Sequence, residues 1–267
     1  ITPIEKLHVE EYVDNFIRLG KFSPDEKERF VSQANVLVEN GFVKGCLTLS
    51  LLLAIYKNEH ELPTNKVLLY EKCFEYIATT REKNKKLMLN SSTGEPYDWT
   101  VLAKLMNDAT FMELSQLGTP NNSDIPEYKV KELMLSLYEQ RFEGSTECKM
   151  GTEMFLQFCS DRTEIFVPSP HSNLEYRFYH RSFYDYFFAK YIEARTNAVE
   201  ATYDKLCMFD TDSEVIELLL TLYQRHNPLY LRELVAYAFS KVENFSNASM
   251  GNSFSKRFEN LVLMMQV

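Results

Sequence analysis

Apolar residues recur at helical spacing along most of this 267-residue chain, and this periodicity is the strongest constraint on its fold. Val9, Val13 and Phe16, for example, share one face of a first helix, which is expected to end at Gly20. The period-two alternation of a strand is confined to the stretches 163–167 and 174–179. The sequence therefore predicts a mainly α-helical protein with one short β-hairpin.

Capping and turn signals divide the helical pattern into segments. Ser23 begins a capping box with Pro24 at the first helical position, and this predicts a second helix that closes at Asn40-Gly41. The run 46–57 is apolar on nearly all sides, which places that helix at the centre of a bundle. The remaining helices are expected at 66–81, 98–117, 126–142, 151–161, 182–196, 199–209, 213–226, 228–242 and 253–265. Because three helices followed by a hairpin is the order of a winged helix, we expect a helical bundle, a winged helix and a second bundle.

Composition excludes several classes of function. The net charge of −9, from 29 basic and 38 acidic residues, disfavours a partner that is held through nucleic-acid phosphates. The chain has only 8 glycines, and its one Gly20-Lys21 pair is followed by Phe22, so it contains no phosphate-binding Walker A loop. Hydrolase, metalloprotease and kinase motifs are also missing. No catalytic residue and no metal ligand is therefore assigned.

The cysteines and the hydropathy of the chain indicate the cellular compartment in which the protein is expected. The five cysteines form no C-x-x-C pair, and four lie beside apolar runs, which is typical of small core residues. The longest apolar run covers 46–56 and is much shorter than the ~20 residues of a membrane span. The chain opens without a signal peptide. These features predict a cytoplasmic protein with no membrane partner.

Two stretches carry a family resemblance. The first runs from Gly45 to Tyr56 and continues through Leu62-Pro63 to Leu69-Tyr70. The second, Tyr176 to Ala189, contains Phe178, His180, Ser182, Phe183, Asp185 and Tyr186 at the spacing F-x-H-x-S-F-x-D-Y. Together they resemble the region that follows the ATPase core of NACHT-type STAND NTPases, with Asp185 where that family has Glu. The resemblance covers about residues 1–200.

The resemblance implies a domain organisation and a nucleotide switch. Residues 1–86 would be the first helical domain, 87–195 the winged-helix domain, and 196–267 the start of a second helical domain or sensor. In this family the winged helix folds back on the core in the ADP state, and its histidine reaches the β-phosphate; that residue would be His180. Cys46 aligns with the proline that encloses the adenine, and this departure puts a direct nucleotide contact by the first domain in doubt.

By the same resemblance, the partners would be the NTPase core of the parent polypeptide and further copies of it. The parent would bind ADP or ATP with magnesium and oligomerise on activation, in signalling, innate immunity or bacterial antiviral defence. This chain lacks the Walker A and B motifs and would be inactive alone.

Other interpretations stay open. His180 could instead cap the helix that begins at Ser182, or satisfy a buried carbonyl. The chain could be a helical protein–protein interaction scaffold, or a winged-helix DNA-binding protein. DNA binding is disfavoured because the stretch 151–161 contains neither Lys nor Arg.

Overall fold

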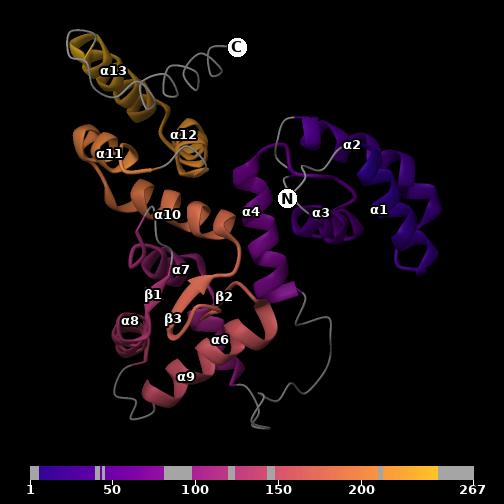
Figure 1. The fold of residues 1–267 in the computed structure, drawn as a ribbon, viewed down its shortest axis with the longest axis horizontal. Helices are drawn as coiled ribbons and strands as arrows, with labels where there is room; N and C mark the ends of the chain where they lie inside the picture. Colours follow the sequence, from indigo (N-terminus) through magenta and orange to yellow (C-terminus); the bar gives the residue numbers. More distant parts are fainter. Residues whose placement is uncertain are drawn as a thin grey trace. The chain divides into compact units, whose positions relative to one another are not determined.

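A computed structural model gives the conformation of the chain and describes residues 6–39, 43, 46–80, 98–119, 124–142, 148–209 and 213–245. The chain divides into two compact units, Ile1–Lys86 and Leu87–Val267. Both are mainly α-helical, as the sequence predicts, and the second also contains a small antiparallel sheet (Figure 1). The helix expected at 253–265 lies outside the described residues, and so does the predicted domain boundary near residue 86.

The first unit is a bundle of helices that pack on their neighbours in chain order. Its described elements are α1 (Lys6–Arg18), η1 (Pro24–Glu26), α2 (Lys27–Glu39), α3 (Cys46–Glu59), α4 (Lys66–Glu75) and the π-helical turn η2 (Tyr76–Thr80). The ring of Phe30 meets the edge of Tyr56, with their centroids 5.3 Å apart, and Phe22 packs on both rings. Since most of the described α3 side chains are buried or half-buried, the central place predicted for this helix is confirmed.

The helix ends show where capping signals hold and where one fails. Gly20 takes a left-handed φ of 64° and closes α1, as predicted. The capping box at Ser23 is wrong: its side chain makes no cap hydrogen bond, and 24–26 form a 3₁₀ turn before α2 begins. The carboxylate of Glu26, the other member of the predicted box, lies 2.8 Å from Nδ1 of His60. Asn65 does cap α4, since its Oδ1 accepts a hydrogen bond from the Leu68 amide.

The second unit contains more elements than the periodicity predicts. Its described elements are α6 (Trp99–Leu105), α7 (Asp108–Ser115), β1 (Ile125–Pro126), α8 (Glu127–Arg141), α9 (Cys148–Phe158), the π-helical turn η3 (Cys159–Thr163), β2 (Phe166–Ser169), β3 (Ser172–Phe178), α10 (Arg181–Arg195), α11 (Val199–Leu206), α12 (Val215–His226) and α13 (Pro228–Phe245). The single helix expected at 98–117 is two helices. Met106 leaves the helical conformation, and Asn107 caps α7 by accepting from the Thr110 amide.

The sheet has the order β1-β3-β2, and both pairings are antiparallel. Phe166 lies opposite Phe178, which fixes the hairpin register, and Ile125 of β1 pairs with Tyr176 on the other edge of β3. The hairpin is confirmed, but β2 begins three residues later than predicted. Thr163 belongs to the π-helical turn η3, so it is not available to a strand. The two-residue β1 is not predicted by the sequence.

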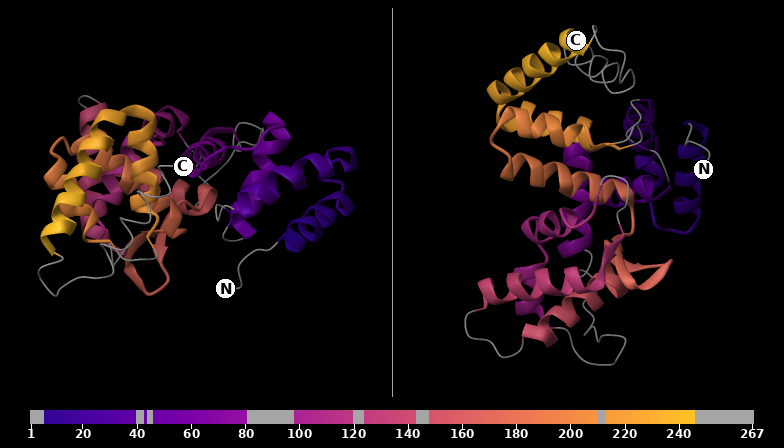
Figure 2. Two further views of the ribbon diagram at one scale, coloured as in Figure 1. Left: turned by 90° about the horizontal axis from the view of Figure 1, so that it is seen from above. Right: turned by 60° about the vertical axis from the view of Figure 1, so that its left-hand side comes forward.

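Helix α10 connects the sheet to the C-terminal helices, packing against both α7 and α12 (Figures 1 and 2). Its aromatic residues Phe183, Tyr186 and Phe187 are buried, while Phe188 is half-buried. The ring of Phe187 stacks on Phe111 of α7, with centroids 5.2 Å apart. The interpretation of this stripe as core is therefore confirmed. Of the helices in the described part of the chain, none is both long and apolar enough to cross a membrane.

Candidate functional site

The candidate site is the junction between β3 and α10, where His180 lies. His180 immediately precedes α10 and has an extended backbone (φ −111°, ψ 129°). Its carbonyl accepts a hydrogen bond from the Phe183 amide, 3.1 Å away, which begins the helix. The imidazole itself makes no cap hydrogen bond. The alternative that its side chain caps this helix is therefore wrong.

The electrostatics of the junction favour a neutral imidazole. The half-buried His180 ring meets the Tyr179 ring edge to face, with centroids 4.8 Å apart. Burial lowers the pKa of His180, and the nearby carboxylate of Glu164 opposes this shift. Because the ordinary histidine pKa is about 6.5, the ring is mostly uncharged at neutral pH. An anion that approached it would favour the protonated form.

Glu164 owes its position to an unusual backbone conformation. It follows the π-helical turn η3 and takes a left-handed φ of 53°, which is uncommon for a residue with a side chain. Next to it, the carbonyl of Ile165 accepts a hydrogen bond from the amide of Tyr179, 3.0 Å away. This hydrogen bond joins the residue before β2 to the residue after β3, next to His180.

A buried carboxylate connects the start of α10 to the start of α12. Asp185 is 1% exposed, and its Oδ1 accepts a hydrogen bond from Nε of Arg181 at 2.8 Å. Its Oδ2 accepts from the backbone amide of Glu214, also at 2.8 Å. Burial raises the pKa of Asp185, and the positive charge of Arg181 opposes that shift. This carboxyl group therefore links the start of α10 to the start of α12, in addition to the direct packing of the two helices.

Arg181 has a second contact at this junction. Its guanidinium lies over the ring of Tyr184, 4.8 Å from the centroid, while the side chain stays 40% exposed. Tyr184 is fully buried, and its hydroxyl has no hydrogen-bond partner within the described residues. Burial raises the pKa of this phenol well above its usual range. The hydroxyl is therefore a structural group that does not exchange protons near neutral pH.

Cys46, the other residue singled out from the sequence, begins α3 in the first unit, and its side chain is outside the described part of the structure. His180 belongs to the second unit, so each residue is placed only within its own unit. The role of Cys46 stays a prediction. Of the other cysteines whose side chains are described, Cys73 and Cys159 are buried as expected, whereas Cys207 is exposed.

In the sequence, Asp185 stands out only as a position of the family motif, and its ion pair with Arg181 is not predicted. The i, i+4 spacing from Arg181 on a helix was the available signal. No sequence pattern indicates Glu214. It interacts with Asp185 through its backbone amide, which every residue other than proline has, and it lies 29 residues away in the sequence. Glu164 was equally hidden, since its place depends on a backbone conformation.

The described residues bear on metal binding and on DNA binding. No group of three or more His, Cys, Asp or Glu side chains that could hold a metal ion occurs among them. The helix predicted at 151–161 is α9, Cys148–Phe158, which includes Lys149. The stretch 151–161 contains neither Lys nor Arg, and the helix has one cation because it begins three residues earlier than predicted. A single lysine does not make the basic face that DNA binding needs.

No protein-family model matches the chain, and neither a curated protein nor a solved structure is significantly similar to it.

Proposed function

We propose that this chain is the regulatory region that follows the ATPase core of a NACHT-type STAND NTPase. Residues 1–86 form the first helical domain, 87–195 the winged-helix domain, and 196–267 the start of the second helical domain. The region controls ADP/ATP-dependent oligomerisation of the parent protein in signalling or antiviral defence. It has no catalytic role by itself, because the parent's core would hold the nucleotide and magnesium.

The observation that carries the proposal is the order of elements around the sheet. Helix α7, strand β1, helices α8 and α9, and the hairpin β2–β3 follow one another in the order of a winged helix. The pairing order β1-β3-β2 is also the one expected when a hairpin adds to a short first strand. His180 lies directly after this hairpin, at the position of the family's nucleotide-sensing histidine.

The chemistry of His180 suits a phosphate sensor. Its imidazole makes no hydrogen bond within the described residues, so it has donor capacity to offer. Backbone hydrogen bonds on both sides of His180 fix its main chain at the start of α10. Since burial disfavours its charge, contact with a phosphate would draw a proton onto the ring and form a charge-assisted hydrogen bond.

The buried carboxyl group of Asp185 gives the switch a way to act on the helices beyond it. His180 and Asp185 both belong to the first turns of the α10 segment, and Asp185 holds the start of α12. A displacement of His180 would therefore move α10 and α12 together. Release of the phosphate would turn these elements as one body and expose a surface for oligomerisation.

The upstream coding sequence provides the first test. A G-x-x-x-x-G-K-[ST] motif followed by an acidic Walker B strand within ~200 residues is expected. An initiator methionine directly upstream, with no such core, would overturn the assignment.

The variant His180→Ala in the parent protein tests the mechanism. We expect faster ADP release or constitutive activity, measured by nucleotide exchange and by oligomer formation. Wild-type ADP affinity should also rise as the pH falls from about 8 to about 6, because binding takes up a proton, and the variant should lose this dependence. His171→Ala, in the exposed turn of the hairpin, is the matched control and should behave as wild type. Unchanged release and pH dependence in His180→Ala would reject the role.

A further inference from the structure

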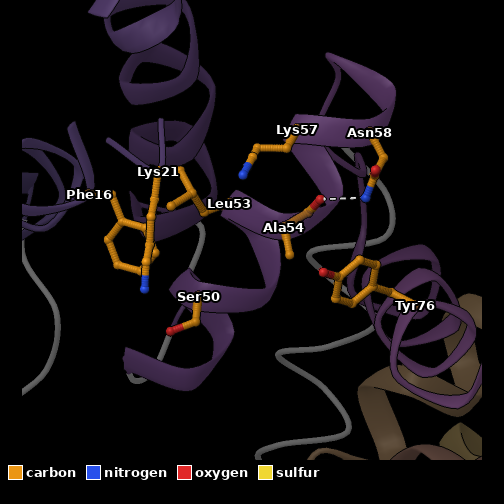
Figure 3. Close-up of a pocket in the computed structure, with 8 residues that line it drawn as sticks. All are labelled: Phe16, Lys21, Ser50, Leu53, Ala54, Lys57, Asn58 and Tyr76. Carbon is orange, nitrogen blue, oxygen red and sulfur yellow. Dashed lines mark hydrogen bonds between the residues drawn. The ribbon is translucent and has the colours of Figure 1, made fainter. Parts of the chain in front are cut away.

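We infer that the first unit contains a binding pocket for a small organic anion with a planar apolar group. The pocket opens between the end of α1 and helix α3, with Tyr76 of η2 at one side, and has a volume of about 340 Å³ (Figure 3). This volume lies within the range of small-molecule sites in proteins. It shares no residue with the β3–α10 junction and does not depend on the proposed function.

The charged groups of the pocket define its preference for anions. Lys21 and Lys57 line it, and no lining residue in the described part of the chain is acidic. Neither lysine forms an ion pair within the described residues, whereas Lys27 and Lys72 of the same unit pair with Asp14 and Glu59. The pocket therefore carries two positive charges that no neighbouring carboxylate in the described residues neutralises, although the chain as a whole has a net charge of −9. Together they would bind a carboxylate, sulfonate or phosphate group.

The remaining walls of the pocket fit a flat apolar body. Leu53 and Ala54 belong to one stretch of α3, and the half-buried rings of Phe16 and Tyr76 also line the pocket. In Figure 3, Tyr76 lies on the opposite side of Ala54 from Phe16, and the Lys57 side chain extends away from Tyr76. The Tyr76 hydroxyl makes no hydrogen bond within the described residues and adds a third donor. Aromatic walls and cations together favour an aromatic anion over an inorganic ion.

The test uses the full chain and anilinonaphthalene sulfonate, a planar aromatic anion whose fluorescence rises on binding. We expect saturable binding at one site. The double variant Lys21→Gln/Lys57→Gln should weaken it roughly tenfold or more, because two charge-assisted contacts are lost. The matched control Lys27→Gln/Lys72→Gln makes the same change in net charge outside the pocket and should leave the affinity within about twofold. Circular dichroism checks that all variants stay folded.

A second probe separates anion binding from adhesion to apolar surface. Phenylnaphthylamine has a similar ring system but no charge, and we expect it to bind the wild type roughly tenfold more weakly or worse. Equal affinity for the two probes would overturn the proposal, and so would equal losses in the two double variants. Absence of saturable sulfonate binding would overturn it as well.

Discussion

Asp185 is a buried carboxyl group whose two oxygens have different partners. Its side chain lies in α10, and it accepts hydrogen bonds from the Arg181 guanidinium and the Glu214 amide. Removal of one partner of a buried charged pair leaves the other unsatisfied, which usually costs more than the pair contributes. This residue is therefore the position of the junction where a single substitution should have the largest effect on stability.

We expect Asp185→Ala to lower the free energy of unfolding by about 2–4 kcal/mol, because it removes the buried carboxyl group that accepts from the Glu214 amide and from Arg181. Asp185→Asn keeps an acceptor for that amide and should cost about half as much. Asp204→Asn, an exposed Asp on α11, is the matched control and should change stability by less than about 0.5 kcal/mol. Urea denaturation monitored by circular dichroism measures all three. Equal values for the Ala and control variants would contradict the assigned role.

The same variants carry a pH dependence whose sign follows from the raised pKa of Asp185. A carboxyl group with a higher pKa in the folded state binds its proton more tightly there, so its stabilising contribution is present at low pH. That contribution is lost as the pH rises through the folded-state pKa. The advantage of the wild type over Asp185→Asn should therefore be larger near pH 4 than near pH 7. A constant difference across this range would contradict the direction of the shift.

At the scale of elements, the contact between α8 and α9 depends on a glycine. Gly151 is buried in α9, and a Cβ atom there would overlap Cε2 of Tyr138 in α8. The Tyr138 ring cannot easily move, because it stacks on Phe142 with centroids 4.3 Å apart. The close approach of these helices therefore requires the absence of a side chain at position 151.

Gly151→Ala should lower the free energy of unfolding by about 1–3 kcal/mol, even though alanine favours helices. Met150→Ala, at an adjacent exposed position, should be close to neutral. The double variant Tyr138→Leu/Gly151→Ala should show a favourable coupling, because the smaller side chain makes room for the new methyl group. Thermal unfolding of the wild type, Gly151→Ala, Tyr138→Leu and the double variant gives the coupling energy. A stabilised Gly151→Ala variant would show that the helices do not approach this closely.

The whole molecule consists of two compact units, each with its own buried aromatic core. Phe30 and Tyr56 belong to the core of the first unit, and Phe111 and Phe187 to that of the second. A unit that buries its own core should fold by itself.

We therefore expect fragments 1–86 and 87–267, expressed separately, each to give dispersed amide NMR spectra. The chemical shifts of core residues in each fragment should match those of the full chain. A fragment cut inside the second unit, such as 87–195, should lose stability because it lacks Glu214, whose amide donates to Asp185, and α12, which packs on α10. A collapsed spectrum for either of the two intact units would contradict their independence.

Local signals were sufficient for much of the fold. The apolar spacing predicted the helical class and the positions of most helices, Gly20 marked the end of α1, and alternation found the hairpin strand β3. These features depend on residues a few positions apart, whose preferences act within one turn or one strand. The sequence also singled out His180, through a motif rather than through any spatial relation.

Tertiary structure decided the features that depend on distant residues. In place of the predicted capping box, Glu26 contacts His60, 34 residues away, and the two-residue β1 forms by pairing with β3. The Asp185–Glu214 hydrogen bond and the pocket with Lys21 and Lys57 also join residues far apart in sequence. Burial then sets the pKa values of His180 and Asp185. The sequence by itself thus determined the helical class and singled out His180. Only the packed structure decided which residues meet, because desolvation and contact arise when distant segments come together.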